Sequence, residues 1–300
     1  MSLVIVGSLA FDTIETPFAR KEKIVGGSGT YCSLAASFFT KPKVVGVIGR
    51  DFPRKTLAFL RSHNIDLRGV QVKPGKTFHW EGRYGLDPNL RTTVKTELNV
   101  FGEFAPRLPE AFQRPRILYL ANIDPDHNEG IFSQLKAKPK ITALDTIQFW
   151  METKPGTLRR ELGRTDVFFA NDEEIKMLAG ESNLIKAGKR VLGWGPSLVV
   201  VKKGEHGALV FGGDFVFGVL AHPCEEVVDT TGAGDCFAGG FLGYLDKVKD
   251  GDKAACRRAA VYGSVLASFA IEDFGIERFA GLRQEEIEAR YRLFKKLVSF

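Results

Sequence analysis

Short apolar runs alternate with helix-length segments through the first two thirds of the chain. Each run is followed by a turn or by a helix signal. Strands and helices in series are typical of a parallel sheet that is covered by helices on both faces. The sequence therefore predicts a doubly wound, mostly parallel α/β fold, with strands at Leu3–Gly7, Lys43–Gly49, Ile117–Ala121, Ile141–Asp145, Val167–Ala170 and Leu198–Lys202.

The last third of the chain changes to helical periodicity. Apolar residues recur there at the spacing of one helix face. A strand that ends at Val228 is expected just before this region. The expected helices, including two between the early strands, are Gly29–Phe39, Phe52–His63, Ala233–Leu245, Lys253–Ala270 and Gln284–Val298.

Two segments, Phe11–Val25 and Val70–Phe101, break the alternation of strands and helices. They are polar, β-branched and aromatic, without an apolar stripe of helix length. Within the second segment, Thr77–Tyr84 and Thr92–Val100 alternate apolar and polar residues, and the turn residues Asp87-Pro88-Asn89 lie between them. We therefore expect a small antiparallel β lid, inserted in two pieces into a single α/β domain over residues 1–300.

Composition and charge narrow the possible partners. The chain has 300 residues, of which 44% are hydrophobic, and a formal net charge of +6. Its basic residues are scattered rather than clustered, so we expect no nucleic-acid partner. No apolar run approaches the roughly 18 residues of a membrane span, so we expect no membrane partner. The first residues lack the basic segment of a signal peptide, which favours a cytoplasmic protein.

The four cysteines and five histidines show no spacing typical of metal ligands. This excludes a structural zinc site of the usual kind and a disulfide framework. A reducing compartment fits the same observation.

The segment Asp229–Asp235, with the sequence DTTGAGD, carries the strongest chemical signal. Glycines at 232 and 234 permit backbone angles that side chains forbid, so the amides of Gly232, Ala233 and Gly234 can point into one concave space. The start of a helix there favours phosphate oxygens. Asp235 in the first turn can take the proton of an attacking hydroxyl group. The segment predicts phosphoryl transfer to an alcohol.

This segment resembles the C-terminal signature of the ribokinase-like (PfkB-type) carbohydrate kinases, and the resemblance extends from Val4 to about Gly275. Val6–Asp12 is similar to the family's first strand and its substrate-binding Asp. A carboxylate just beyond a first strand also lies where open α/β sheets bind ligands. The position of Asp12 therefore makes it a candidate acceptor-binding residue even without the resemblance. The glycines at 26 and 27 resemble the Gly-Gly motif that closes over the sugar, which implies that Gly26 and Gly27 bind the acceptor.

The resemblance also implies a nucleotide site that uses ATP and Mg²⁺. Asn171 and Glu174 match the family's N-x-x-E motif, which orders the magnesium ion and the phosphates directly or through water. Lys202, Gly204 and Gly207 lie in a stretch that resembles the nucleotide-binding turn. The residues alone leave two alternatives open: Asn171 and Glu174 also fit a helix cap, and Lys202 also fits a surface lysine at a strand end.

Many members of the family hold a monovalent cation, such as K⁺, beside the anion hole. Asp229 and Thr231 could supply ligands for it. The chain departs from the family in its acceptor motif, because Tyr31 stands where an Asn often binds the sugar and Ser28 replaces a frequent Lys. These departures leave the identity of the acceptor open.

The sequence thus predicts an ATP-dependent kinase that phosphorylates a hydroxymethyl group of a sugar or a related polyol, with Asp235 as base. Three alternatives remain. A nucleoside kinase would stack a base on aromatic residues, and a phosphosugar kinase would need a basic clamp; the third alternative is an inactive binding protein. The candidates for stacking a base are Tyr31, Phe11, Phe78 and Trp80. The candidates for the basic clamp are Arg83, Arg91 and Lys95.

The lid segments also predict an oligomeric state. A sheet this small cannot bury both faces, and one face would leave Phe78 or Trp80 in water. The same sheet of a second subunit would cover them, so we expect a homodimer through the lids.

Overall fold

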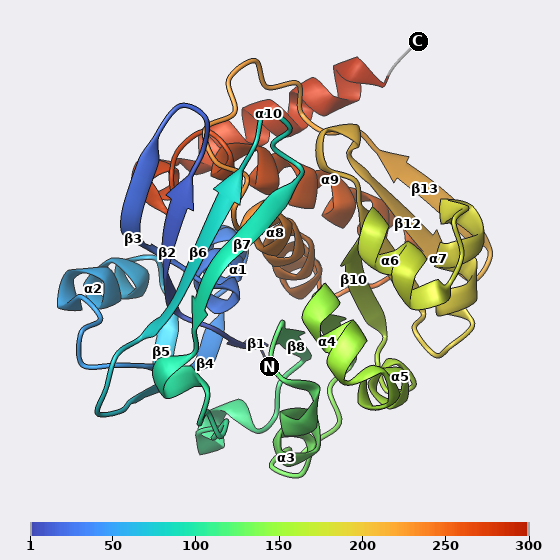
Figure 1. Cartoon of the computed structure of the whole chain (residues 1–300). Coiled ribbons are helices and arrows are strands. Elements are labelled where there is room, and N and C mark those ends of the chain that lie inside the picture. Colours follow the sequence, from blue (N-terminus) through green and yellow to red (C-terminus); the bar gives the residue numbers. More distant parts are fainter. Residues whose placement is uncertain (1, 299–300) are drawn as a thin grey trace.

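The computed structural model describes residues 2–298, and a nine-stranded sheet forms the centre of this part (Figure 1). Its strands from β11 to β5 run parallel, and β12 and β13 add an antiparallel edge. The order across the sheet is β13 (Phe215–Val219), β12 (Ala208–Gly212), β11 (Leu198–Lys202), β10 (Val167–Asn171), β9 (Ile141–Asp145), β8 (Ile117–Ala121), β1 (Leu3–Gly7), β4 (Lys43–Ile48) and β5 (Asp66–Val72).

Helices cover both faces, so the sheet has a separate core on each side. Strand β1 shows the division, since Leu3 and Ile5 enter one core while Val4 and Val6 enter the other. This alternation is the period of a strand that is buried on both faces. The first core contains α1 (Ser28–Ser37), α2 (Arg54–Ser62), α8 (Ala233–Val248), α9 (Lys253–Ala270) and α10 (Gln284–Leu297), and the second contains α3 (Asn128–Phe132), α4 (Gln148–Thr153), α5 (Pro155–Leu162), α6 (Asp172–Ala179) and α7 (Leu184–Leu192).

Short 3₁₀ helices lie in several of the connections. They are η1 (Asn99–Phe101), η2 (Glu110–Phe112), η3 (Pro125–His127), η4 (Gly204–His206) and η5 (Glu277–Ala280). Within residues 2–298, none of the helices is both long and apolar enough to cross a membrane.

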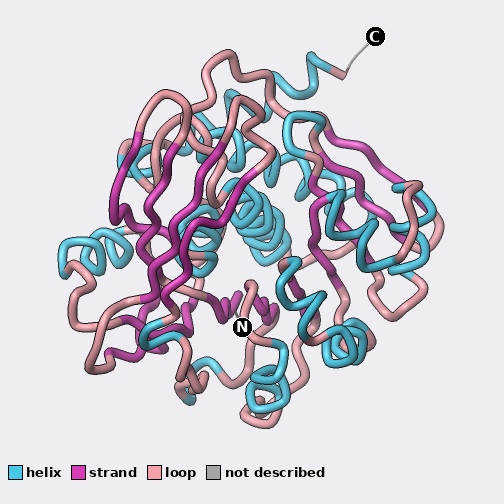
Figure 2. The backbone as a smooth tube through the Cα atoms, viewed as in Figure 1, coloured by secondary structure: helices cyan, strands magenta, loops and turns pink. Residues whose placement is uncertain are grey.

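The predicted lid is present as a second sheet, whose strands lie apart from the main sheet (Figure 2). Its order is β3 (Arg20–Gly26), β2 (Ala10–Glu15), β6 (Phe78–Tyr84) and β7 (Arg91–Glu97). Two details differ from the expectation. The central pair β2–β6 is parallel, because two hairpins lie side by side with their first strands in the same direction. The second lid segment also starts later than residue 70, because Val70–Val72 pairs with Gly46–Ile48 in the main sheet.

The strand expected to end at Val228 is absent: the described chain has no regular secondary structure from residue 220 to residue 230. The Val228 amide instead donates a hydrogen bond to the carbonyl of Ile271, just after α9, at 2.9 Å. The backbone at Val228 is therefore held by a hydrogen bond to a loop and not by a sheet.

The two faces of the lid differ in polarity. On one face, Arg20 forms ion pairs with Glu15 and Glu81. On the other, Trp80 packs with Ile14, Tyr84 and Phe274. Phe78 stacks on Phe101, with ring centroids 5.3 Å apart. Phe78 and Trp80 are therefore partly buried by contacts within the chain itself, and the homodimer stays a prediction.

Glycines let α8 approach α1 closely. A Cβ atom at Gly239 would lie 2.3 Å from the carbonyl oxygen of Cys32, and one at Gly243 would lie 2.9 Å from the Cα of Ala36. Both atoms belong to the α1 backbone, which cannot move aside as a side chain can. This contact fixes the start of α1, next to Gly27, relative to the start of α8, next to Asp235.

Replacing Gly239 with Ala tests this contact. Alanine favours the helix by about 1 kcal/mol, but the clash with the Cys32 carbonyl forces the helices apart. We expect a net fall of about 1–3 kcal/mol in the free energy of unfolding, measured by urea denaturation. Gly251→Ala is the control, because a Cβ atom there meets open space. An equal stability of Gly239→Ala and wild type would contradict the close packing.

Candidate active site

The candidate residues gather at the carboxyl edge of the parallel strands. Asp145 ends β9, Asn171 ends β10 and Lys202 ends β11. Asp235 lies in the first turn of α8. Since parallel strands bring their carboxyl ends to one edge, residues far apart in the sequence meet there.

The glycine turn before α8 depends on Gly232. This residue has φ 77° and forms the N-cap of the helix. A Cβ atom on it would lie 2.4 Å from the ring of Tyr31. Gly234 differs from the expectation, because its backbone is helical and a Cβ atom would first meet the Lys202 Nζ, at 3.1 Å. Position 232 needs glycine for conformation, whereas Gly234 keeps open the space above the lysine.

Tyr31 does not line an open acceptor site. Its side chain is 1% exposed and lies under the glycine turn. Its hydroxyl group has no hydrogen-bond partner among the described residues. The structure thus places the ring of Tyr31 against Gly232.

The carboxyl group of Asp235 has a raised pKa. Burial and the neighbouring Asp145 raise its pKa to about 7, against the opposing effects of Lys202 and Arg91. Glu174 raises the same pKa further. A carboxyl group with a pKa near neutrality is a good general base for a hydroxyl proton, because it is deprotonated in part and still holds a proton well.

Lys202 and Asp145 form an ion pair at the floor of the site. The Lys202 Nζ lies 2.7 Å from Asp145 Oδ2, and the Tyr119 hydroxyl donates to the same oxygen at 3.3 Å. Burial lowers the pKa of Lys202, but the carboxylates of Asp145 and Glu174 outweigh this effect and raise it. Lys202 is therefore a fixed cation beneath Gly234, and not a solvated surface lysine.

Asp145 was not among the predicted site residues. It ends a buried strand at the carboxyl edge of the main sheet, so the rule that ligands bind at this edge would have found it.

Asn171 and Glu174 form a helix cap, which is one of the two alternatives that the sequence left open for them. The Glu174 amide donates to Asn171 Oδ1 at 2.7 Å, and the Asn171 amide donates to Glu174 Oε2 at 2.8 Å. Burial raises the pKa of Glu174, against the charge of Lys202. The cap uses one carboxylate oxygen of Glu174, Oε2.

Asp12 is held against the Gly-Gly motif. A Cβ atom at Gly26 would lie 1.8 Å from Asp12 Oδ2, so only glycine fits beside the carboxylate. The backbone of Gly27, with φ 94°, hydrogen-bonds to it. Burial, followed by the charges of Asp229 and Asp235, raises the pKa of Asp12 to about 8.

The lid hairpin contacts both the glycine turn before α8 and the turn after β11. The Tyr84 and Thr231 hydroxyls lie 2.8 Å apart, and the Thr230 hydroxyl donates to the Pro88 carbonyl at 2.7 Å. At the hairpin tip, the side chain of Asn89 lies against Gly204. The lid is therefore closed over the glycine turn.

The turn after β11 brings the predicted nucleotide-side glycines together. Gly204 has φ 52° and Gly207 has φ 77°. A Cβ atom at Gly207 would lie 2.0 Å from the carbonyl oxygen of Val219. Both glycines are required by the turn itself.

Asp229 holds the start of the glycine turn. Its Oδ1 accepts a hydrogen bond from the Thr231 amide at 2.9 Å. Its Oδ2 is buried and has no partner among the described residues. Burial raises the pKa of Asp229.

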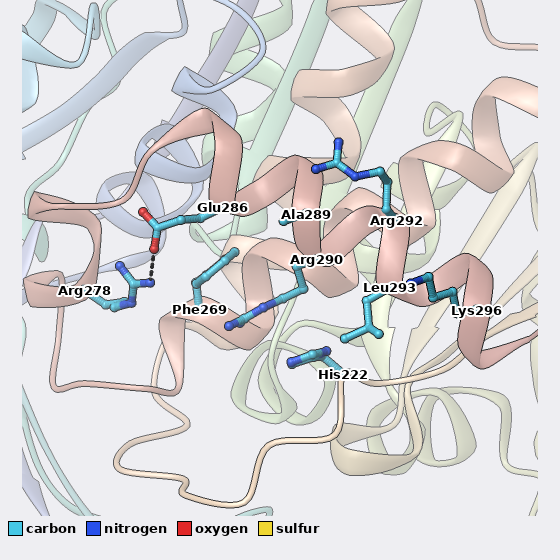
Figure 3. A pocket seen from close by; sticks show the side chains of 9 residues that line it. All are labelled: His222, Phe269, Arg278, Glu286, Ala289, Arg290, Arg292, Leu293 and Lys296. Atoms are coloured by element: carbon cyan, nitrogen blue, oxygen red, sulfur yellow. Dashed lines mark hydrogen bonds and ion pairs between the residues drawn. The ribbon is translucent and has the colours of Figure 1, made fainter.

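A cavity of about 590 Å³ lies elsewhere, between α9, α10 and His222 (Figure 3). Its lining contains several basic side chains, but two of them are paired. Arg278 lies 2.8 Å from Glu286, and Arg290 lies 2.6 Å from Glu272. The first pair joins η5 to α10, and the second joins α10 to the segment just after α9. None of the residues of the glycine turn lines the cavity.

Comparison with known proteins decides the family. Residues 2–277 match the model of the pfkB family carbohydrate kinases. The chain belongs to this family. It is an ATP-dependent kinase of the sugar and nucleoside type, so the predicted family, fold class and enzyme class are confirmed.

Individual relatives support this assignment. The PfkB-family chain is 33% identical to a cytidine kinase from Thermococcus kodakarensis over 246 residues, which cover 81% of this chain and 87% of the relative. Two solved structures share the fold. One is a putative ribokinase II from E. coli in complex with ATP and Mg²⁺ (TM-score 0.80, 19% identity, 98% and 100% covered). The other is a nucleoside kinase from Burkholderia thailandensis in complex with inosine (TM-score 0.76, 20% identity, 97% and 98% covered).

The raised pKa of Asp12 predicts a pH-dependent cost in stability. Between pH 4 and 8 the folded PfkB-family kinase binds more protons at Asp12 than the unfolded chain does, so the free energy of unfolding falls as pH rises through this range. Asp12→Asn removes the buried charge. We expect this variant to exceed wild type by at least about 1 kcal/mol at pH 8 and to lose the advantage near pH 4.

Urea denaturation at several pH values measures this effect. Asp66→Asn is the control of opposite sign, because Arg68 lowers the pKa of Asp66, and the variant should gain no stability at pH 8. Parallel stability curves for Asp12→Asn and wild type from pH 4 to 8 would contradict the burial of a costly carboxylate.

Proposed function

We propose that this kinase transfers the γ-phosphate of ATP to the hydroxymethyl group of a nucleoside. The observation that carries the proposal is the pairing of Asp12 with Trp80 on neighbouring lid strands. Residues directly opposite each other in a sheet share a face. A carboxylate for ribose hydroxyls therefore lies next to an indole on which a base can stack. The 33% identity to a cytidine kinase supports the same acceptor class.

The other aromatic candidates for base stacking pack against other residues of the chain. Tyr31 lies under Gly232, and Phe78 stacks on Phe101. Phe11 lies against Phe52, with centroids 5.6 Å apart. Trp80, which is only partly buried, is the candidate that remains at the acceptor side.

A phosphosugar acceptor fits the lid less well. Arg83 pairs with Glu15, and Lys95 pairs with Glu97. Of the three basic residues considered for a clamp, only Arg91 is left, and a single arginine is a weak clamp for a second phosphate.

In the proposed reaction, Asp235 takes the proton of the acceptor hydroxyl as its oxygen bonds to the γ-phosphorus. The bond from this phosphorus to ADP breaks in the same transfer. The amides of Gly232 and Gly234 and the cation of Lys202 hold the negative oxygens, whereas the Ala233 amide already donates to the carbonyl of Thr230 at 3.2 Å. Asp12 and the Gly27 backbone orient the acceptor.

The donor side fits a magnesium ion that is held mainly through water and phosphates. Among residues 2–298, no three His, Cys, Asp or Glu side chains are grouped closely enough to hold a metal. We propose that Glu174 Oε1 and the Asn171 amide nitrogen, which the helix cap does not use, order water around such an ion. When bound, Mg²⁺ neutralises charge on the phosphate oxygens.

We also propose a monovalent cation such as K⁺ beside the anion hole. The buried Asp229 Oδ2 has no partner among the described residues, and Thr231 follows it in the same turn. A cation there would offset the buried carboxylate and strengthen the field at the glycine turn.

A panel of nucleosides and sugars tests the acceptor class. We expect the highest kcat/KM with a nucleoside. Trp80→Ala should raise the nucleoside KM by about tenfold or more, because base stacking contributes about 1–3 kcal/mol. Trp80→Phe keeps a stacking surface and is the matched control. A sugar that is phosphorylated more efficiently than every nucleoside, with a KM unaffected by Trp80→Ala, would contradict the proposal.

A further inference from the structure

The indole of Trp80 lies flat on its own strand, β6. An added Cβ atom at Gly82 would lie 2.0 Å from Cη2 of the ring, and 2.5 and 2.7 Å from the neighbouring Cζ2 and Cζ3. The three distances differ little, which is the pattern of an atom above the ring plane and not beside its edge. Residues two positions apart in a strand share a face. The six-membered ring of Trp80 therefore rests on the backbone of Gly82.

A hydrogen bond from the neighbouring strand holds the edge of the same ring. Trp80 Nε1 donates to Thr93 Oγ1 at 3.3 Å. Thr93 lies on β7 as the register partner of Gly82. Gly82 thus supplies the space for the ring and Thr93 supplies a hydrogen-bond acceptor, so the plane of the indole is fixed by two residues.

The face of the indole opposite Gly82 is directed away from β6, on the side of the lid that carries Asp12. The guanidinium of Arg91 lies over the ring at 5.9 Å from its centroid, near the outer limit of a cation–π contact. Arg91 is exposed, and its long side chain can move without disturbing the strand. A planar group can therefore reach the indole from the side that the strand does not cover.

We propose that Gly82 and Thr93 are positioning residues for the acceptor, because they hold the Trp80 indole in the plane on which a nucleobase stacks. The inference rests on the proposed function, in which Trp80 stacks the base. The gain from stacking depends on how the two rings are oriented, and not only on the presence of an aromatic side chain. A plane that is set before the nucleoside binds also lowers the entropy cost of ordering the side chain.

Gly82→Ala tests the proposal. The added methyl group displaces the indole from its plane, so the nucleoside KM should rise by about fivefold or more. The kcat at saturating nucleoside and the KM of ATP should change by less than about twofold, because only acceptor binding is lost. Gly85→Ala is the matched control, since it adds a methyl group to another glycine of the lid, where a Cβ atom would meet nothing within 4 Å.

Thr93 gives a second test, which leaves the space beneath the indole unchanged. Thr93→Val removes the hydroxyl group and keeps the branched shape, and it should raise the nucleoside KM by about two- to tenfold. Thr93→Ser keeps the hydroxyl group and should restore the KM. Thr92→Val is the control, because Thr92 pairs with Arg83 on the ion-paired face of the lid.

A double-variant cycle shows whether Gly82 acts through the indole. In the Trp80→Ala background the methyl group of Gly82→Ala meets no ring, so it should have no further effect on the nucleoside KM. An equal effect in both backgrounds would overturn the inference, because the glycine would then serve the strand and not the indole. So would a normal KM in Gly82→Ala and Thr93→Val beside a raised KM in Trp80→Ala. A normal nucleoside KM in Trp80→Ala would overturn the proposed function itself.

Discussion

The contact between Gly232 and the ring of Tyr31 is the constraint on which the site depends. The left-handed backbone of Gly232 starts α8 directly above this ring, which belongs to α1. The same helix α1 begins beside Gly27, which is proposed to bind the acceptor. One contact therefore sets the distance between Gly27 and the glycine turn, and the glycines of α8 that pack along α1 extend the contact into the core.

Around this contact the fold concentrates buried charge. The pKa values of Asp12, Glu174 and Asp235 are all raised, chiefly by burial. Within the site, Lys202 and Arg91 supply compensating charge from the sheet and from the lid. Such an arrangement is costly for stability but suits phosphoryl transfer, in which negative charge enters the site and a carboxylate must hold a proton.

The sequence predicted the main features of the fold because strand alternation and helix periodicity are local signals. It singled out Asp12 because this residue follows a strand that ends in glycine, and Asp235 because it follows the glycine turn; their roles stay predictions. It did not show that Tyr31 lies beneath Gly232, since that contact joins residues about 200 positions apart in different helices. The parallel pairing of β2 with β6 likewise depends on how two hairpins lie in space, which no local pattern records.

The most direct test of the account is single-turnover phosphoryl transfer by Asp235→Asn, measured together with ATP binding. The substitution keeps the shape of the side chain and removes its ability to accept a proton. The account predicts a fall in the transfer rate of about 10²–10⁴-fold, with an ATP Kd close to that of wild type. A transfer rate near that of wild type would show that the carboxylate at the start of α8 is not the base.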